Sequence, residues 1–283
     1  MKNISFINSH IIFATNHGKA SAAVEPFKRI LQARVRELPI ESDLMGTFTG
    51  EVDRHGTMID ALRGKVALAR NRTSERFILV SEGSFGPSNF GFFAQGIEML
   101  LLYDTITGVE ILEQSISPDT NYATASLRTR QELSRFLDRI SFGSHAAVLY
   151  PEGLPLAANV RKGITDRAEA EGVFDDAITK SPVRSVMAMS DMRAHLNPTR
   201  MRSIASCCEL LAQRLATACP ACACGGFGLV QIIPGLPCAR CGSATQLARA
   251  EKHSCPFCGA TQERHRADGR TSADPSACEW CNP

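Results

Sequence analysis

Eight cysteines near the C-terminus are the residues whose type and spacing point most clearly to chemistry. They form four C-x-x-C pairs, which are Cys219/Cys222, Cys238/Cys241, Cys255/Cys258 and Cys278/Cys281. A C-x-x-C turn can direct two thiolates at one tetrahedral metal ion, and two such turns complete a Cys₄ zinc site. Four turns therefore predict two structural zinc ions. Their binding would supply on the order of 10 kcal/mol per site to a tail with few large apolar residues.

The spacing leaves open which turns share a zinc ion. Consecutive, interleaved and nested pairings are all compatible with it, and the compact stretch 238–258 slightly favours nesting. Cys224 is close enough to Cys222 to be an alternative ligand, but we interpret it as a bystander. Cys207 and Cys208 fall in a helical pattern and are expected to be small core residues. The alternative interpretation is that the pairs are redox dithiols. Four turns at near-regular spacing fit this interpretation less well than they fit zinc sites.

A second set of polar residues lies in the first 218 residues, after the predicted strands. Backbone amides at a helix N-terminus, with a lysine in the first turn, form an anion site, and residues 15–19 have this form. The predicted phosphate-binding residues are Asn16, Lys19, Ser84 and Arg193, and the predicted catalytic residues are Glu51, Lys65 and Glu82. In this hypothesis the glutamates hold Mg²⁺, which prefers oxygen ligands, and orient water, while the lysines neutralise phosphate oxygens.

Each of these residues also has a purely structural interpretation. Residues 16–18 can be a turn, Lys65 can be a solvated side chain, and His195 can cap the entry to a helix. The arrangement is what favours a shared site. Three polar loops follow successive strands, and ligands of open α/β sheets bind beyond the carboxyl ends of the strands.

The elements that would position these residues alternate between strands and helices. Apolar periodicity and turn residues predict strands at 9–15, 35–40, 76–81, 97–104, 109–117, 145–150 and 184–189. The same patterns predict helices at 19–36, 57–71, 126–140, 169–180 and 198–218. This order predicts an α/β fold, a mixed sheet with helices on both faces, in residues 1–218. A small double zinc-ribbon domain that binds two zinc ions would follow in residues 219–283.

The chain resembles a bacterial family known only as a domain of unknown function. The matching stretches are 16–19, 46–51, 81–87, 191–195 and 197–201, together with the cysteine tail that ends in Cys278-Glu-Trp-Cys281. These strings are long and unusual. The resemblance covers most of the chain and implies no particular activity.

The N-terminal loops also resemble those of the inosine-triphosphate pyrophosphatase-like fold. That fold has an N-x-x-K loop after its first strand, a lysine on a following helix, and an acidic loop after a further strand. Asn16, Lys19, Lys65 and Glu82 occupy these places here. The resemblance implies hydrolysis of a nucleoside triphosphate with magnesium. The sequence departs from the pattern at Ala61, where an asparagine is expected, and in having one acid at residue 82 instead of two.

Charge and hydropathy argue against several other classes of function. Lys and Arg number 31 against 29 Asp and Glu, and the net charge of +2 provides no drive toward nucleic acid or anionic lipid. Eight thiolates on two zinc ions would make the net charge about −2, so we expect no nucleic-acid partner. The apolar stretch 99–103 is too short for a membrane span, and the N-terminus lacks the apolar region of a signal peptide. We therefore expect a cytoplasmic protein.

Two function classes remain. The first is a metal-dependent hydrolase of a phosphorylated small molecule, such as a nucleoside triphosphate. The alternative is a non-enzymatic zinc-ribbon adaptor or ligand-binding protein, with the zinc tail contacting a protein partner. Convergence of the five residues Asn16, Lys19, Glu51, Lys65 and Glu82 on one pocket would favour the hydrolase.

Overall fold

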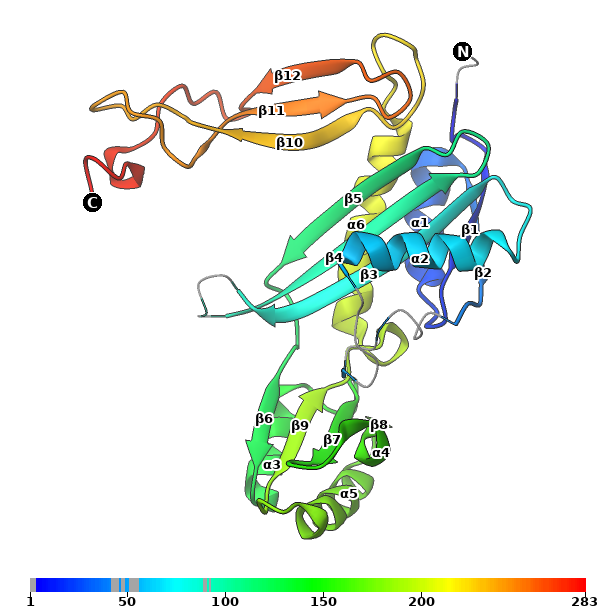
Figure 1. The fold of residues 1–283 in the computed structure, drawn as a ribbon, viewed down its shortest axis with the longest axis vertical. Coiled ribbons are helices and arrows are strands. Elements are labelled where there is room, and N and C mark those ends of the chain that lie inside the picture. Colours follow the sequence, from blue (N-terminus) through cyan, green and yellow to red (C-terminus); the bar gives the residue numbers. More distant parts are fainter. Residues whose placement is uncertain (1–3, 42–45, 47–48, 51–55, 89–90, 92) are drawn as a thin grey trace. The chain divides into compact units, whose positions relative to one another are not determined.

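The computed structural model describes residues 4–41, 46, 49–50, 56–88, 91 and 93–283. The chain folds as two compact units (Figure 1). Asn8–Ala212 forms one, which we call the α/β unit, and Gln213–Pro283 joins the N-terminal residues up to Ile7 in the other, the cysteine unit. This division lies a few residues before residue 218, and the predicted domain boundary there stays a prediction. Among the described helices, none combines the length and apolarity that crossing a bilayer requires.

A five-stranded mixed sheet forms the centre of the α/β unit, which confirms the predicted fold class. Its strands are β1 (His10–Ala14), β2 (Arg34–Leu38), β3 (Phe77–Pro87), β4 (Ala94–Asp104) and β5 (Glu110–Ser117). Their order is β2-β1-β3-β4-β5. β1 runs parallel to both of its neighbours, whereas β3, β4 and β5 form an antiparallel meander. The chain therefore adds β2 on one side of β1 and then β3 on the other side, so the strand order reverses at β1.

Helices cover both faces of this sheet. They are α1 (Ala20–Leu31), α2 (Met58–Arg70) and α6 (Pro198–Ala216), and Figure 1 shows α2 on one face and α1 on the other. The crossover from β1 through α1 to β2 and the crossover from β2 through α2 to β3 run across the sheet in opposite directions, and the usual right-handed connection then places α1 and α2 on opposite faces. α2 begins with a capping box between Thr57 and Asp60, and it buries Leu62 and Val66 against the sheet residues Ile78, Val80 and Leu101.

A second, antiparallel sheet lies between β5 and α6 in the chain. Its strands are β6 (Thr124–Leu127), β7 (Ala147–Pro151), β8 (Arg161–Ile164) and β9 (Val186–Ser190), in the order β6-β9-β7-β8. The helices α3 (Arg130–Arg139) and α5 (Arg167–Lys180) pack on its apolar core, and α4 (Leu156–Asn159) is a single short turn. The predicted helix at 126–140 begins later, because Ser126 and Leu127 pair with β9 and a capping box at Thr129 begins α3.

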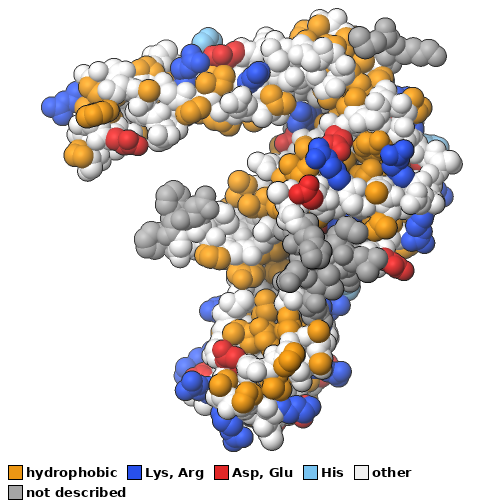
Figure 2. All heavy atoms as spheres, in the orientation of Figure 1, with side chains coloured by type: hydrophobic (Ala, Val, Ile, Leu, Met, Phe, Trp, Pro, Cys, Tyr) orange, Lys and Arg blue, Asp and Glu red, His pale blue; other side chains and the backbone are white. Residues whose placement is uncertain are grey.

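The cysteine unit contains a small antiparallel sheet. Its strands are β10 (Gly228–Pro234), β11 (Ala248–Ser254) and β12 (Thr261–His265), in that order. The cysteine turns lie before, between and after these strands. On the face seen in Figure 2, hydrophobic side chains lie along this unit among side chains of both charges. The buried cluster of Cys219, Phe227 and Cys255 is small.

Candidate functional sites

The carboxyl ends of β1 and β3 form the first candidate site. β1 ends at Ala14, whereas the neighbouring β3 continues to Pro87, so β3 has no β1 partner beyond residue 79. The chain leaves β1 for α1 through residues 15–19, and strand order reverses at this point. In open α/β sheets this is where ligands bind.

Two lysines from different helices meet at one residue of β3. Lys19, at the start of α1, donates from Nζ to the Ser81 hydroxyl at 3.0 Å, and Lys65 of α2 donates to the Ser81 carbonyl at 2.8 Å. Lys65 also forms an ion pair with Glu82. Both lysines are only 6% exposed. The predicted residues Lys19, Lys65 and Glu82 are thus brought together within one hydrogen-bonded group.

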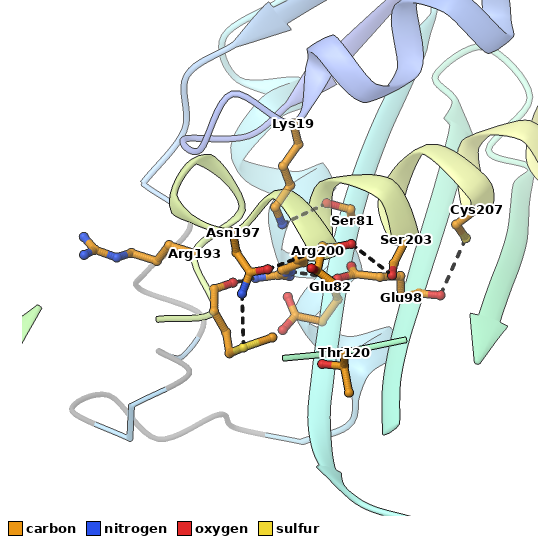
Figure 3. A network of polar contacts seen from close by, with 12 residues as sticks. Lys19, Ser81, Glu82, Glu98, Thr120, Arg193, Asn197, Arg200, Ser203 and Cys207 are labelled. Carbon is orange, nitrogen blue, oxygen red and sulfur yellow. Dashed lines mark hydrogen bonds and ion pairs between the residues drawn. The ribbon is translucent and has the colours of Figure 1, made fainter. Parts of the chain in front are cut away.

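A second buried ion pair completes this group. Arg200, in the first turn of α6, donates from Nε to Glu98 Oε1 of β4 at 2.7 Å, and the side chains are 8% and 2% exposed. The guanidinium also donates to the Met192 carbonyl and lies 4.8 Å from the centroid of the Phe85 ring. Figure 3 shows these contacts converging with Lys19 and Ser81. We call Lys19, Lys65, Glu82, Glu98 and Arg200 the charged cluster.

A glycine on β3 makes room for this ion pair. Gly83 lies opposite Glu98 in the β3–β4 register. A Cβ atom at position 83 would clash with the Arg200 guanidinium and lie 3.0 Å from Glu98 Oε1. The pair therefore occupies the space that a side chain at position 83 would fill.

Burial and charge in the cluster act most strongly on Lys19. Desolvation, aided by the positive charges of Arg200 and Lys65, lowers the pKa of Lys19 to about 7, although Glu98 and Glu82 oppose the shift. At pH values below about 7, where Lys19 is charged, three cationic side chains face two carboxylates. Glu98 Oε2 is buried and has no hydrogen-bond partner among the described residues. Such a site favours an anion that would neutralise the excess positive charge.

The other predicted site residues lie outside this cluster. Asn16 is exposed in the loop between β1 and α1, and Ser84 lies further along β3. Arg193 donates to the buried Asp191 carboxylate, with a shortest distance of 2.7 Å from Nη2 to Oδ2, and Figure 3 shows its guanidinium directed away from the charged cluster. Glu51 lies outside the described residues. Its predicted role stays a prediction.

Sequence reasoning missed Glu98 and Arg200 as site residues. Glu98 is a single charge in an otherwise apolar strand, Ile97-Glu-Met-Leu-Leu101, and a charge at such a position requires a buried partner. That signal was available in the sequence. Arg200 could not be assigned as the partner, because 102 residues separate it from Glu98.

The cysteines form two tetrads that could each hold a metal ion. Cys219 and Cys222 gather with Cys255 and Cys258, and Cys238 and Cys241 gather with Cys278 and Cys281. Within each tetrad the ligand atoms lie within 4.8 Å of one another. Distances between Sγ atoms of different turns are 3.7 Å for Cys219–Cys258 and 3.6 Å for Cys241–Cys278. The first turn thus joins the third and the second joins the fourth, which is the interleaved arrangement and not the nested one.

Backbone geometry around the turns suits thiolate ligands. The amides of Ala221 and Arg240 each point at the first sulfur of their turn, at 3.4 Å. Gly242 and Gly259, just after the second cysteines, have positive φ values of 75° and 72°. Ala223 takes the same left-handed conformation after Cys222, with a φ of 58°. The first turn, which has alanine in place of this glycine, therefore adopts the same backbone at some cost in strain.

The three remaining cysteines belong to neither tetrad. Cys207 and Cys208 are buried on α6, and burial raises the pKa of Cys207 to about 12. The Cys207 thiol lies 3.6 Å from the Glu98 carbonyl oxygen, to which it donates. Cys224 accepts a hydrogen bond from the Ile4 amide at 3.4 Å. These contacts agree with structural roles for all three thiols.

Fold and sites together define an α/β protein with a buried charged cluster at a sheet reversal and two Cys₄ groups able to hold metal. The chain belongs to the family described as Domain of unknown function (DUF6671), whose model matches residues 65–283. No curated protein matches the chain. The family confirms the expected resemblance to a domain of unknown function, and these findings give no support to the resemblance to the inosine-triphosphate pyrophosphatase-like fold.

Proposed function

We propose that the charged cluster binds the phosphate groups of a small molecule and that the protein hydrolyses this molecule with the help of a divalent metal ion. The observation that supports this is the meeting of Lys19, Lys65 and Arg200 with two carboxylates where strand order reverses. Excess positive charge in a desolvated site stabilises the negative charge that develops when a phosphate bond breaks.

The cluster provides separate groups for the separate tasks. Lys19 and Lys65 would neutralise phosphate oxygens, and Arg200 would fix their position from α6. Glu82 and Glu98 offer carboxylate oxygens that fit Mg²⁺, and Glu98 Oε2 in particular lacks a hydrogen-bond partner among the described residues. When bound, the metal would neutralise phosphate charge and lower the pKa of an attacking water.

The hydrolase proposal is tested by assaying the purified chain with Mg²⁺ or Mn²⁺. Release of phosphate or pyrophosphate is followed for common, deaminated and oxidised nucleotides and for simple phosphate esters. We expect turnover of at least one compound and its loss in Lys65→Ala. Lys28→Ala is the matched control, because Lys28 is an exposed lysine on α1. Failure to hydrolyse any of these compounds contradicts the proposal.

We further propose that the two tetrads hold structural zinc ions. Four thiolates close the coordination shell, whereas a catalytic zinc ion keeps one position open. Mass spectrometry of the native protein should therefore find two zinc ions per chain. A zinc-free chain whose cysteine unit keeps its fold would contradict this role.

A role in protein contacts is favoured by a different observation, in the cysteine unit. The edge strand β10 exposes Leu229, Val230 and Ile232 at 39%, 52% and 49% of their surface. Its seven residues carry no charge, so two copies could pair along this edge without repulsion. Sedimentation velocity should show self-association that Val230→Lys abolishes, and a strictly monomeric chain contradicts this second function.

A further inference from the structure

A pocket of about 500 Å³ is lined by residues at the end of β3, at the start of β4 and in the segment between β5 and β6. The segment between β5 and β6 forms one of its walls with Thr120, Asn121 and Tyr122, and Pro87 and Arg139 lie on other sides. Its volume falls in the range of sites that enclose a small organic ligand. The proposed phosphate site makes no use of this pocket.

Short contacts connect the pocket wall to the cluster. Arg200 lies on the Phe85 ring, and an added Cβ at Gly96 would lie 3.0 Å from that ring and 3.9 Å from the Thr120 side chain. The Asn197 side chain also connects Arg200 to the pocket wall. Its Oδ1 accepts a hydrogen bond from the Arg200 amide at 2.9 Å, and its Nδ2 donates to Asn121 Oδ1 at 2.8 Å. A ligand bound at the cluster is therefore within reach of this wall.

The wall is held in place without a ligand. The Tyr122 amide donates to the Thr120 hydroxyl at 3.2 Å. Ala123 and Ser190 exchange hydrogen bonds, from the Ala123 amide to the Ser190 hydroxyl at 2.9 Å and from the Ser190 amide to the Ala123 carbonyl at 3.0 Å. These bonds fix the segment to β9, so binding would require little ordering of the wall.

The lining chemistry suits a flat, neutral heterocycle. Tyr122, Pro87 and neighbouring alanines offer apolar surface, and a tyrosine ring can stack on a planar base. Asn121 accepts a hydrogen bond from Asn197 through its carbonyl oxygen, and its buried Nδ2 has no hydrogen-bond partner among the described residues. The described lining residues include Arg139 and no Asp or Glu, which disfavours a cationic group.

We propose that this pocket holds the base of a nucleotide whose phosphates lie at the charged cluster, an inference that rests on the proposed function. Tyr122 stacks on the base, and Pro87 and the alanines of the lining pack against it. The substrate class of the site is then nucleotides, as opposed to inorganic polyphosphates or phosphorylated sugars.

Calorimetric titration without divalent metal, which prevents turnover, tests the inference. The ligands are the four common ribonucleoside triphosphates and inorganic tripolyphosphate. At least one nucleotide should bind about tenfold more tightly than tripolyphosphate, because stacking of one base contributes about 1–3 kcal/mol. Tyr122→Ala should remove this difference and leave tripolyphosphate binding unchanged, whereas Tyr122→Phe, which keeps the ring, should preserve it.

Each other outcome contradicts a separate claim. If tripolyphosphate binds as tightly as every nucleotide, or if Tyr122→Ala keeps the preference, the pocket is no base site while the phosphate site stands. If no ligand binds, tripolyphosphate included, the phosphate site itself is wrong. Circular dichroism of each variant confirms that the fold is intact.

Discussion

Exchange of Arg200 for methionine should lower the free energy of unfolding of the α/β unit by about 3–5 kcal/mol. The variant leaves the Glu98 carboxylate buried at 2% exposure without its ion-pair partner, and removal of one member of a buried pair usually costs this much. The loss is a large part of the 5–15 kcal/mol by which domains are usually stable. It should be measurable by urea unfolding followed by circular dichroism.

A double-mutant cycle separates the ion pair from simple packing. Glu98→Leu removes the acid alone and should be about as costly as Arg200→Met, whereas the double variant leaves no buried charge unpaired and should recover much of the loss. Trp280, the only tryptophan, lies in the cysteine unit, so its fluorescence reports whether that unit is affected. Single variants that change stability by less than about 1 kcal/mol, or strictly additive effects, would refute the reasoning.

Further predictions concern the lysine, the glycine and the tetrads. The pKa of Lys19 is lowered from 10.5 to about 7 in the folded protein. Between these two pH values the unfolded chain therefore binds one more proton at Lys19 than the folded chain does. The free energy of unfolding should rise with pH over this range, and Lys19→Met should flatten the rise. Binding of an anion favours the charged amine, and tripolyphosphate affinity should fall as pH rises above about 7, which calorimetry at several pH values checks. Gly83→Ala should cost about 1–3 kcal/mol by displacing Arg200, measured by urea unfolding, and a neutral effect would show that the pair can move. The double variant Cys222→Ser/Cys258→Ser should lose one of the two zinc ions in native mass spectrometry, whereas loss of both ions would contradict the interleaved pairing.

The sequence predicts best what local pattern controls. Lys19, Lys65 and Glu82 follow or flank buried apolar runs, and the rule that strand ends carry ligands brings them to one place. The eight cysteines are recognisable because the C-x-x-C turn is a local structure with its own geometry. Neither inference requires knowledge of how distant segments meet.

What the sequence does not predict depends on distant pairing. The β3–β4 register places Glu98 opposite Gly83 and so brings it into the site. Arg200 lies on α6, which follows the second sheet in the chain. The separate sheet of β6–β9 and the interleaved tetrads likewise depend on long-range pairing. The strands have similar apolar patterns and the four C-x-x-C turns are alike, so these patterns do not select which partners pair. Arg193 lies beside polar residues in sequence and forms an ion pair with Asp191, outside the charged cluster, so its predicted role stays a prediction.

The central claim is that the charged cluster is a phosphate site, and a calorimetric titration with inorganic tripolyphosphate at pH 6.5–7 tests it most directly. The account predicts saturable binding by the wild-type chain and by Lys28→Ala, and its loss in Lys65→Ala with the fold preserved. Absence of binding by the wild type, or equal affinity in all three proteins, would contradict it.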